Sequence, residues 1–227
     1  MKKQFSKPLI FFLFFLAIFQ LSLCNAVNAQ IMISEDFDDE VFDTNTWENK
    51  SFGSGATNEV NGSLKLTAQN GVYGRGYFTS NFYLVGDFDI QIDFSLISFT
   101  NYWSGAGIYV FTEDRQTYMN IYIAAYGIGG KAYTAIYQID GTLYVPPGCS
   151  TSTNDVSGTF RLVRVGSQMT SYYWSNGDWE QLVTSEVTDE KLSFEVAAGN
   201  TPAATPYTEV HFDNLIIDAD SFAPACD

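Results

Sequence analysis

The chain has 227 residues, with 26 acidic residues against 11 basic ones and a formal net charge of −15. Nucleic acids and anionic membrane surfaces are bound through basic patches, so this excess of acid argues against both as partners. The length suits one large domain, and no segment after the first thirty residues has the composition of a linker.

The N-terminus has the three parts of an export signal. Lys2, Lys3 and Lys7 stand in a stretch without acids, and residues 9–23 are almost all apolar. The segment ends in residues 27–29 (VNA), which fit the small-x-small pattern of a cleavage site ending at Ala29. We therefore expect residues 1–29 to be a signal peptide that is cleaved after Ala29. The protein would then be secreted, periplasmic or held at the cell surface.

Two alternatives to cleavage remain open. An uncleaved anchor is disfavoured because the apolar run falls short of the ~20 residues that span a bilayer, so we expect no membrane insertion after cleavage. A lipoprotein signal at Cys24 is disfavoured because Leu23 occupies the position where such signals need a small residue. Cleavage leaves residues 30–227 as one domain, with eight basic residues against all 26 acidic ones and a formal net charge of −18.

From residue 31 onward, apolar and polar residues alternate with period two between turn signals, and no stretch has helical spacing. Residues 87–94 (DFDIQIDF) give the clearest alternation, with one apolar and one polar face. Hairpin turns are indicated at residues 61–62, 140–141, 166–167 and 175–178, where glycine accompanies Asn, Asp or Ser. The pattern predicts an all-β chain folded as two packed antiparallel sheets.

The strands between residues 106 and 139 have aromatic residues on faces that would otherwise be polar. Residues 117–125 place Met119, Ile121 and Ile123 on one face and Tyr118, Asn120 and Tyr122 on the other. In residues 132–139, Tyr133 and Tyr137 share a face. If these strands are neighbours, they make a platform suited to a sugar ring or another amphipathic ligand, extended by Tyr102 and Trp103. The alternative is that half of these rings pack in the core.

Three segments carry a family resemblance: residues 82–94 (FYLVGDFDIQIDF), residues 158–166 (GTFRLVRVG) with the Tyr-Tyr-Trp hairpin that follows, and residues 210–217 (VHFDNLII). They resemble the concanavalin A-like (laminin-G-like) lectin and glucanase domains of secreted bacterial proteins. They occur in the family's order and span most of the domain. The resemblance implies a two-sheet antiparallel jelly-roll sandwich that binds a glycan or a cell-surface polysaccharide.

The same resemblance implies that the first and last strands run side by side. Asp36 and Asp38 would then approach Asp213 and Asn214, where the alternation slips and indicates a bulge. Carboxylate and amide oxygens are ligands for Ca²⁺, so we expect one structural calcium ion to be bound by these four residues. The alternative is that these are exposed acids of an acidic protein.

Two cysteines remain after cleavage, Cys149 and Cys226, and an exported chain allows them to form a disulfide. We favour the disulfide over two free thiols. Zinc lacks ligands, because the domain has one histidine and two cysteines.

Catalytic chemistry has weak support in the sequence. The segment 35–40 (EDFDDE) lacks the glucanase spacing Glu-x-Asp-x-x-Glu, because Phe37 stands at the middle acidic position. Asp87, Asp89 and Asp93 share a face whose simpler interpretation is a solvated surface. His211 has no Gly-x-Ser-x-Gly turn to act with. We assign no catalytic residue.

Three of the four arginines stand in segments expected to be strands or loops. Arg161 and Arg164 have opposite parity on one strand, so they cannot serve one site without a bulge, and we expect both to pair with acids on the outer surface. Arg75 stands between glycines in an expected loop, from which it could reach a ligand.

The function that the sequence favours is a secreted, non-catalytic module that binds carbohydrate or glycoconjugate. Two alternatives stay open: a glycoside-active enzyme of the same fold, and a structural protein of the cell envelope or matrix that associates through exposed aromatic residues.

Overall fold

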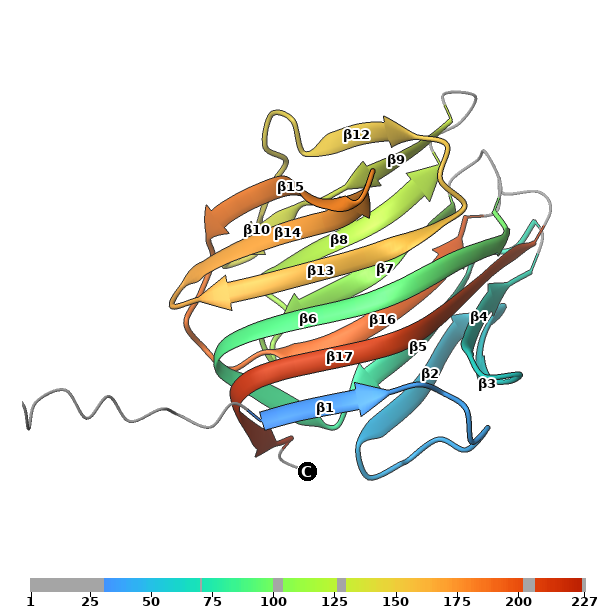
Figure 1. The fold of residues 1–227 in the computed structure, drawn as a ribbon, viewed down its shortest axis with the longest axis horizontal. Coiled ribbons are helices and arrows are strands. Elements are labelled where there is room, and N and C mark those ends of the chain that lie inside the picture. Colours follow the sequence, from blue (N-terminus) through green and yellow to red (C-terminus); the bar gives the residue numbers. More distant parts are fainter. Residues whose placement is uncertain (1–30, 70, 100–103, 126–129, 202–206, 226–227) are drawn as a thin grey trace, which may run out of the picture.

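A computed structural model describes residues 31–69, 71–99, 104–125, 130–201 and 207–225 as strands, turns and loops of an antiparallel β-sandwich (Figure 1). These residues contain no helix, and therefore none that could cross a membrane. The prediction of an all-β, two-sheet fold is confirmed.

Sheet A lies in front in Figure 1. Its strand order is β15 (Asp178–Glu186), β14 (Gln168–Ser175), β13 (Ser157–Val165), β6 (Phe82–Ser98), β17 (Thr208–Pro224), β4 (Leu64–Ala68) and β3 (Gly55–Glu59), and β1 (Ile31–Glu35) also pairs with β17. The two long strands, β6 and β17, pair over most of their length and form the centre of the sheet.

Sheet B lies behind it. Its strand order is β11 (Thr142–Tyr144), β10 (Tyr137–Ile139), β8 (Tyr118–Ala125), β7 (Ser104–Phe111), β16 (Ser193–Asn200), β5 (Gly74–Ser80) and β2 (Trp47–Gly53). Two further strands, β9 (Lys131–Thr134) and β12 (Ser150–Thr153), extend the sheet beside β8.

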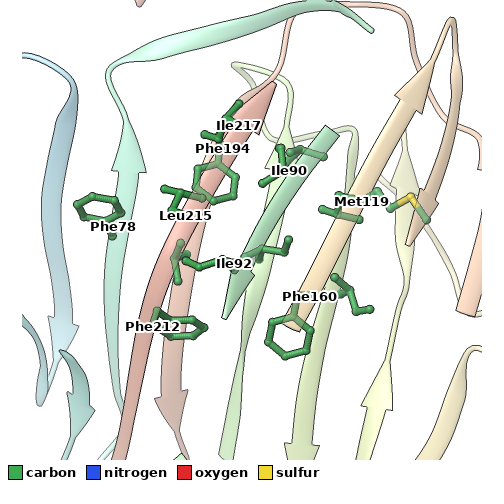
Figure 2. Close-up of a cluster of buried hydrophobic side chains, with 14 of the residues drawn as sticks. Phe78, Ile90, Ile92, Met119, Phe160, Phe194, Phe212, Leu215 and Ile217 are labelled. Carbon is green, nitrogen blue, oxygen red and sulfur yellow. The ribbon is translucent and has the colours of Figure 1, made fainter. Parts of the chain in front are cut away.

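The core fills the space between the sheets. The apolar face predicted for residues 87–94 is buried in β6, where Ile90 and Ile92 are fully inaccessible. Figure 2 shows Ile90 and Ile92 within one cluster of buried side chains that also includes Phe78, Met119 and Phe194 from sheet B. Burial of this apolar surface is the main stabilising term of the fold, at about 25 cal/mol per Å².

The turns follow the sequence signals. Asn61 and Gly62, Asp140 and Gly141, and Asn176 and Gly177 all have positive φ, as two-residue hairpin turns of type I′ require. The bulge predicted near Asp213 is also present, because the pairing of β17 with β6 shifts register between Asp213 and Ile216, and Asn214 has a φ of 51°.

Candidate functional site

The outer face of sheet B carries two adjoining hollows that share Arg75 and Tyr109. Their lining residues are Tyr73, Gly74, Arg75, Gly105, Tyr109, Tyr122, Ala197, Gly199, Asn200 and Thr201 for the first and Arg75, Tyr109, Phe111, Arg115, Tyr118 and Glu195 for the second. We call the two together the Arg75 groove. It crosses β5, β16, β7 and β8, which are four consecutive strands of sheet B.

Strand alternation explains why these side chains face outward. On β7, Ala106, Ile108 and Val110 are buried in the core, so Gly105 and Tyr109 point to the opposite face. The same period on β8 sends Met119 inward and Tyr118 and Tyr122 outward.

The floor of the groove is made of small residues. Gly105 on β7 pairs with Gly199 on β16, and Gly107 pairs with Ala197. A Cβ atom on Gly105 would meet nothing nearer than the carbonyl oxygen of Ile123 at 4.0 Å. The hollow therefore exists because the strands here carry almost no side chains on this face.

Arg75 stands at the junction of the two hollows. Its guanidinium carbon lies 5.0 Å from the ring centroid of Tyr77 and 4.8 Å from that of Tyr109, within cation–π range of both rings. Burial acts to lower the pKa of Arg75, but Tyr109 and Glu195 outweigh it and raise that pKa, so the group stays charged. Arg75 lies on β5, and the expectation that it belongs to a loop was wrong.

Glu195 is the acidic residue of the groove and is only 3% exposed. Its Oε2 atom accepts hydrogen bonds from Thr79 at 3.3 Å and from Arg115 at 3.0 Å. The guanidinium of Arg115 also lies 3.8 Å from the ring centroid of Phe111. Glu195 is therefore fixed by its partners: it forms an ion pair with Arg115, and its charge also acts on Arg75.

A glycosidase needs two carboxyl groups, about 5–9.5 Å apart, on either side of the glycosidic bond. Among the described residues that line the Arg75 groove, Glu195 is the only carboxylate. The internal segments outside the described ranges, residues 70, 100–103, 126–129 and 202–206, contain no Asp or Glu in their sequences. The described lining of the groove therefore offers one carboxylate and not a pair.

The predicted aromatic platform is present in part. Tyr118 and Tyr122 line the groove as expected, and burial raises the pKa of the Tyr118 hydroxyl. Asn120 is only 2% exposed, and its Oδ1 accepts a hydrogen bond from the Ile136 amide at 3.0 Å, which occupies it within the fold. Tyr102 and Trp103 lie outside the described residues.

Tyr133 and Tyr137 share a face, but it is the core face, and their placement on the platform was wrong. The register pairs Tyr133 with Ile123 and Tyr137 with Met119, and both partners point inward. Tyr133 is 1% exposed, stacks on Tyr173 at 4.2 Å and donates a hydrogen bond to Asp155 at 2.8 Å.

Sequence reasoning missed Tyr109 and Glu195 as site residues. The sequence does carry a signal for Tyr109. Gly105, Gly107 and Tyr109 alternate with apolar residues of the same strand, so they share the face opposite the core. No local signal marks Glu195, whose strand β16 is buried on both faces.

The acidic edge predicted to bind calcium is assembled only in part. β1 pairs with β17 so that Glu35 lies opposite Leu215, which brings Asp36 next to Asn214. Burial raises the pKa of Asp213, and Asp93, Asp38 and Asp36 add to that rise. Nevertheless, the described part of the chain contains no group of three or more His, Cys, Asp or Glu side chains arranged to hold a metal ion. Calcium binding by these four residues therefore stays a prediction.

A serine–histidine–glutamate chain lies on the outer face of sheet A and was not foreseen. Ser63 Oγ is 3.0 Å from His211 Nδ1, and His211 Nε2 is 2.9 Å from Glu209 Oε1. This order of groups is that of hydrolases with an activated serine. However, Ser63 Oγ also donates to the Val60 carbonyl at 3.2 Å, which competes with His211 for its proton.

The surroundings of this chain also oppose such chemistry. Asp93 and Asp213 line the hollow beside Ser63, so their negative charge would destabilise an oxyanion. Burial acts to raise the pKa of Glu209, but hydrogen bonds from Lys65, His211 and Tyr207 outweigh it and lower that pKa. The network ties the β3–β4 turn to β17, and we interpret it as structural.

The remaining predicted residues lie in ordinary structural positions. Arg161 pairs with Asp89 on the outer face, as expected. The expectation for Arg164 was wrong, because it is 1% exposed and donates to the carbonyls of Gly86 and Glu190. Cys149 is buried as a free thiol and Cys226 lies outside the described residues, so the predicted disulfide is not observed.

Comparison with known proteins gives a family and a fold. The family model described as "Protein of unknown function (DUF1583) C domain" matches residues 26–225. No protein with a curated description matches the chain.

Three solved structures illustrate the fold. LamA E269S from Zobellia galactanivorans, in complex with laminaritriose and laminaritetraose, has a TM-score of 0.63 and 11% identity and covers 84% of this chain and 99% of its own. The β-glucanase of Bacillus licheniformis has a TM-score of 0.60 and 11% identity, over 83% and 97% of the two chains. Lectin II from Ulex europaeus has a TM-score of 0.57 and 10% identity, over 83% and 98%. The concanavalin A-like sandwich is confirmed, and it is shared by lectins and glycoside hydrolases.

Proposed function

The chain belongs to the family described as "Protein of unknown function (DUF1583) C domain", and on that premise we propose that it is an exported, non-catalytic carbohydrate-binding domain whose ligand lies in the Arg75 groove. Export is supported by the sequence pattern of residues 1–29.

The groove itself carries the proposal. Tyr109, Tyr118 and Tyr122 surround a floor of Gly105, Ala197 and Gly199. Tyrosine rings offer a flat apolar surface for the C–H face of a sugar, and their hydroxyl groups can hydrogen-bond its rim. The glycine and alanine backbone between the tyrosines leaves space for the sugar ring. Ligand sites are generally concave in this way, with few polar groups.

Binding is favoured over hydrolysis by the acid content of the groove. Its single carboxylate among the described lining residues, Glu195, is engaged by Arg115 and Thr79. A hydrolase would need a second carboxylate across the scissile bond.

A glycan array, followed by titration calorimetry on each hit, tests the proposal. We expect at least one hit, and a loss of affinity of at least tenfold in Tyr122→Ala. The matched control is Trp174→Ala, which removes an exposed aromatic ring from sheet A and should leave affinity unchanged. An array without hits, or equal affinities of wild type and Tyr122→Ala for every hit, would contradict the proposal.

A further inference from the structure

The four arginines of the chain differ in what they bind. Arg115 pairs with Glu195, Arg161 with Asp89, and Arg164 donates to two backbone carbonyls. Arg75 contacts Tyr77 and Tyr109 only through the faces of their rings. Within the described part of the chain its guanidinium takes part in no hydrogen bond or ion pair, although the charge of Glu195 acts on it.

Arg161 differs from Arg75 in its hydrogen-bond partner. Its guanidinium also lies over two aromatic rings, 5.5 Å from Tyr172 and 5.3 Å from Trp179. Its nitrogen atoms Nε and Nη2 nevertheless donate to the carboxylate of Asp89 as a fork. Two arginines are thus held alike by aromatic rings on the two sheets, but only Arg161 is hydrogen-bonded to a carboxylate of the protein.

The charge balance of the groove is opposite to that of the domain. Arg75, Arg115 and Glu195 give its lining one net positive charge, whereas the domain after cleavage carries a formal −18. An arginine held between rings presents a planar array of N–H donors, and this geometry matches a carboxylate or a sulfate.

We propose that the Arg75 groove binds an acidic saccharide, and that Arg75 donates hydrogen bonds to the carboxylate of a uronic acid or to a sulfate ester. This inference rests on the proposed function and specifies its ligand class. Both anions offer paired oxygens to a guanidinium, and the neighbouring tyrosines hold the sugar ring that carries them.

The acids of the domain do not prevent this contact. The Debye length is about 8 Å at physiological ionic strength, so acids on sheet A and at the acidic edge act weakly at the groove. Glu195, which is close, is paired with Arg115. We therefore expect the selectivity for acidic saccharides to depend on Arg75 itself. It should be measured near 0.15 M salt.

The test compares oligosaccharides of equal length by titration calorimetry on the full mature chain. The probes are tetramers of guluronate and of galacturonate, a sulfated carrageenan tetrasaccharide, and laminaritetraose as the neutral reference. We expect at least one acidic probe to bind at least tenfold more tightly than laminaritetraose, and Arg75→Gln to remove that preference. The preferred acidic probe distinguishes carboxylate from sulfate recognition.

Three variants separate the possible outcomes. Arg161→Gln is the matched control and should keep the acidic preference, whereas Arg75→Lys should keep only part of it because the fork is lost. Gly105→Leu places a side chain in the open hollow and should weaken every probe. Melting curves check that each variant is folded.

Two results would overturn the inference in different ways. If laminaritetraose binds as tightly as the acidic probes, with Arg75→Gln without effect and Gly105→Leu disruptive, the acidic ligand class is wrong and the proposed function stands. If no probe binds, or if Gly105→Leu binds like the wild type, both the ligand class and the proposed groove are wrong.

Discussion

Gly105 on β7 is the register partner of Gly199 on β16, so two neighbouring strands expose bare backbone at the same level of the outer sheet face. The tyrosines and Arg75 stand around this gap rather than over it. Glycine in a central strand weakens the strand, since it costs backbone entropy and packs no side chain. The cost is consistent with a surface kept open for a ligand.

Glu59 should make the stability of the domain depend on pH. It is 7% exposed, and burial, with smaller contributions from Asp39 and Glu35, raises its pKa from 4.5 to about 7. Because the folded state holds this proton more tightly than the unfolded state, the stabilisation is complete below about pH 4.5 and is lost as the pH rises to 7.

Glu59→Gln should therefore raise the free energy of unfolding at pH 8 by roughly 2 kcal/mol and change it little at pH 4. Denaturant unfolding at the two pH values measures this difference. Glu180→Gln, at an exposed position of β15, is the control and should have little effect at either pH. Equal effects of Glu59→Gln at pH 4 and pH 8 would show that Glu59 titrates normally.

Asp213→Asn tests the acidic edge. Burial and the nearby acids raise the pKa of Asp213, so its ionised form costs stability at neutral pH. In EDTA at pH 7 the variant should melt at a higher temperature than the wild type, by the equivalent of about 0.5–1 kcal/mol, and the difference should vanish near pH 3. A variant that melts lower in EDTA at pH 7 would refute the repulsion.

The same melting curves decide the calcium prediction made from the sequence. A rise in melting temperature on adding Ca²⁺ to the wild type, absent in Asp213→Asn, would establish the site. Curves that EDTA and Ca²⁺ leave unmoved would show that Asp36, Asp38 and Asp213 are only a charged edge.

Tyr133 and Tyr137 should respond differently to loss of the hydroxyl group. Tyr133→Phe removes the hydrogen bond to Asp155 from a buried site and should cost about 1–2 kcal/mol in unfolding free energy. Tyr137→Phe, on the same face but half-buried, should cost less than about 0.5 kcal/mol. Equal costs would contradict the core position of Tyr133, and neither variant should alter glycan affinity.

Local pattern was sufficient for the strands and hairpins. The alternation in residues 87–94 and the Asn-Gly and Asp-Gly turns depend on neighbours in sequence, so strands and hairpins could be predicted. Parity also correctly grouped Tyr133 with Tyr137. Which face is the core depends on the register with β8, which sets Tyr133 opposite Ile123 and Tyr137 opposite Met119, and the alternation alone does not give that register.

The site was harder to predict for the same reason. Arg75, Tyr109 and Glu195 come from three strands, β5, β7 and β16, that are distant in sequence and adjacent in the sheet. The Ser63–His211 contact likewise joins residues 148 positions apart. Side chains that meet only through sheet topology leave no spacing signal in the chain.

The most direct test of the central claim is NMR mapping of backbone amide shifts in the mature domain during titration with an oligosaccharide that binds. The proposed function predicts that the largest shifts fall on amides of the Arg75 groove, among them Gly105, Tyr109 and Gly199, with sheet A unchanged. Shifts concentrated on sheet A, around the Trp174–Trp179 hairpin or His211, would contradict it.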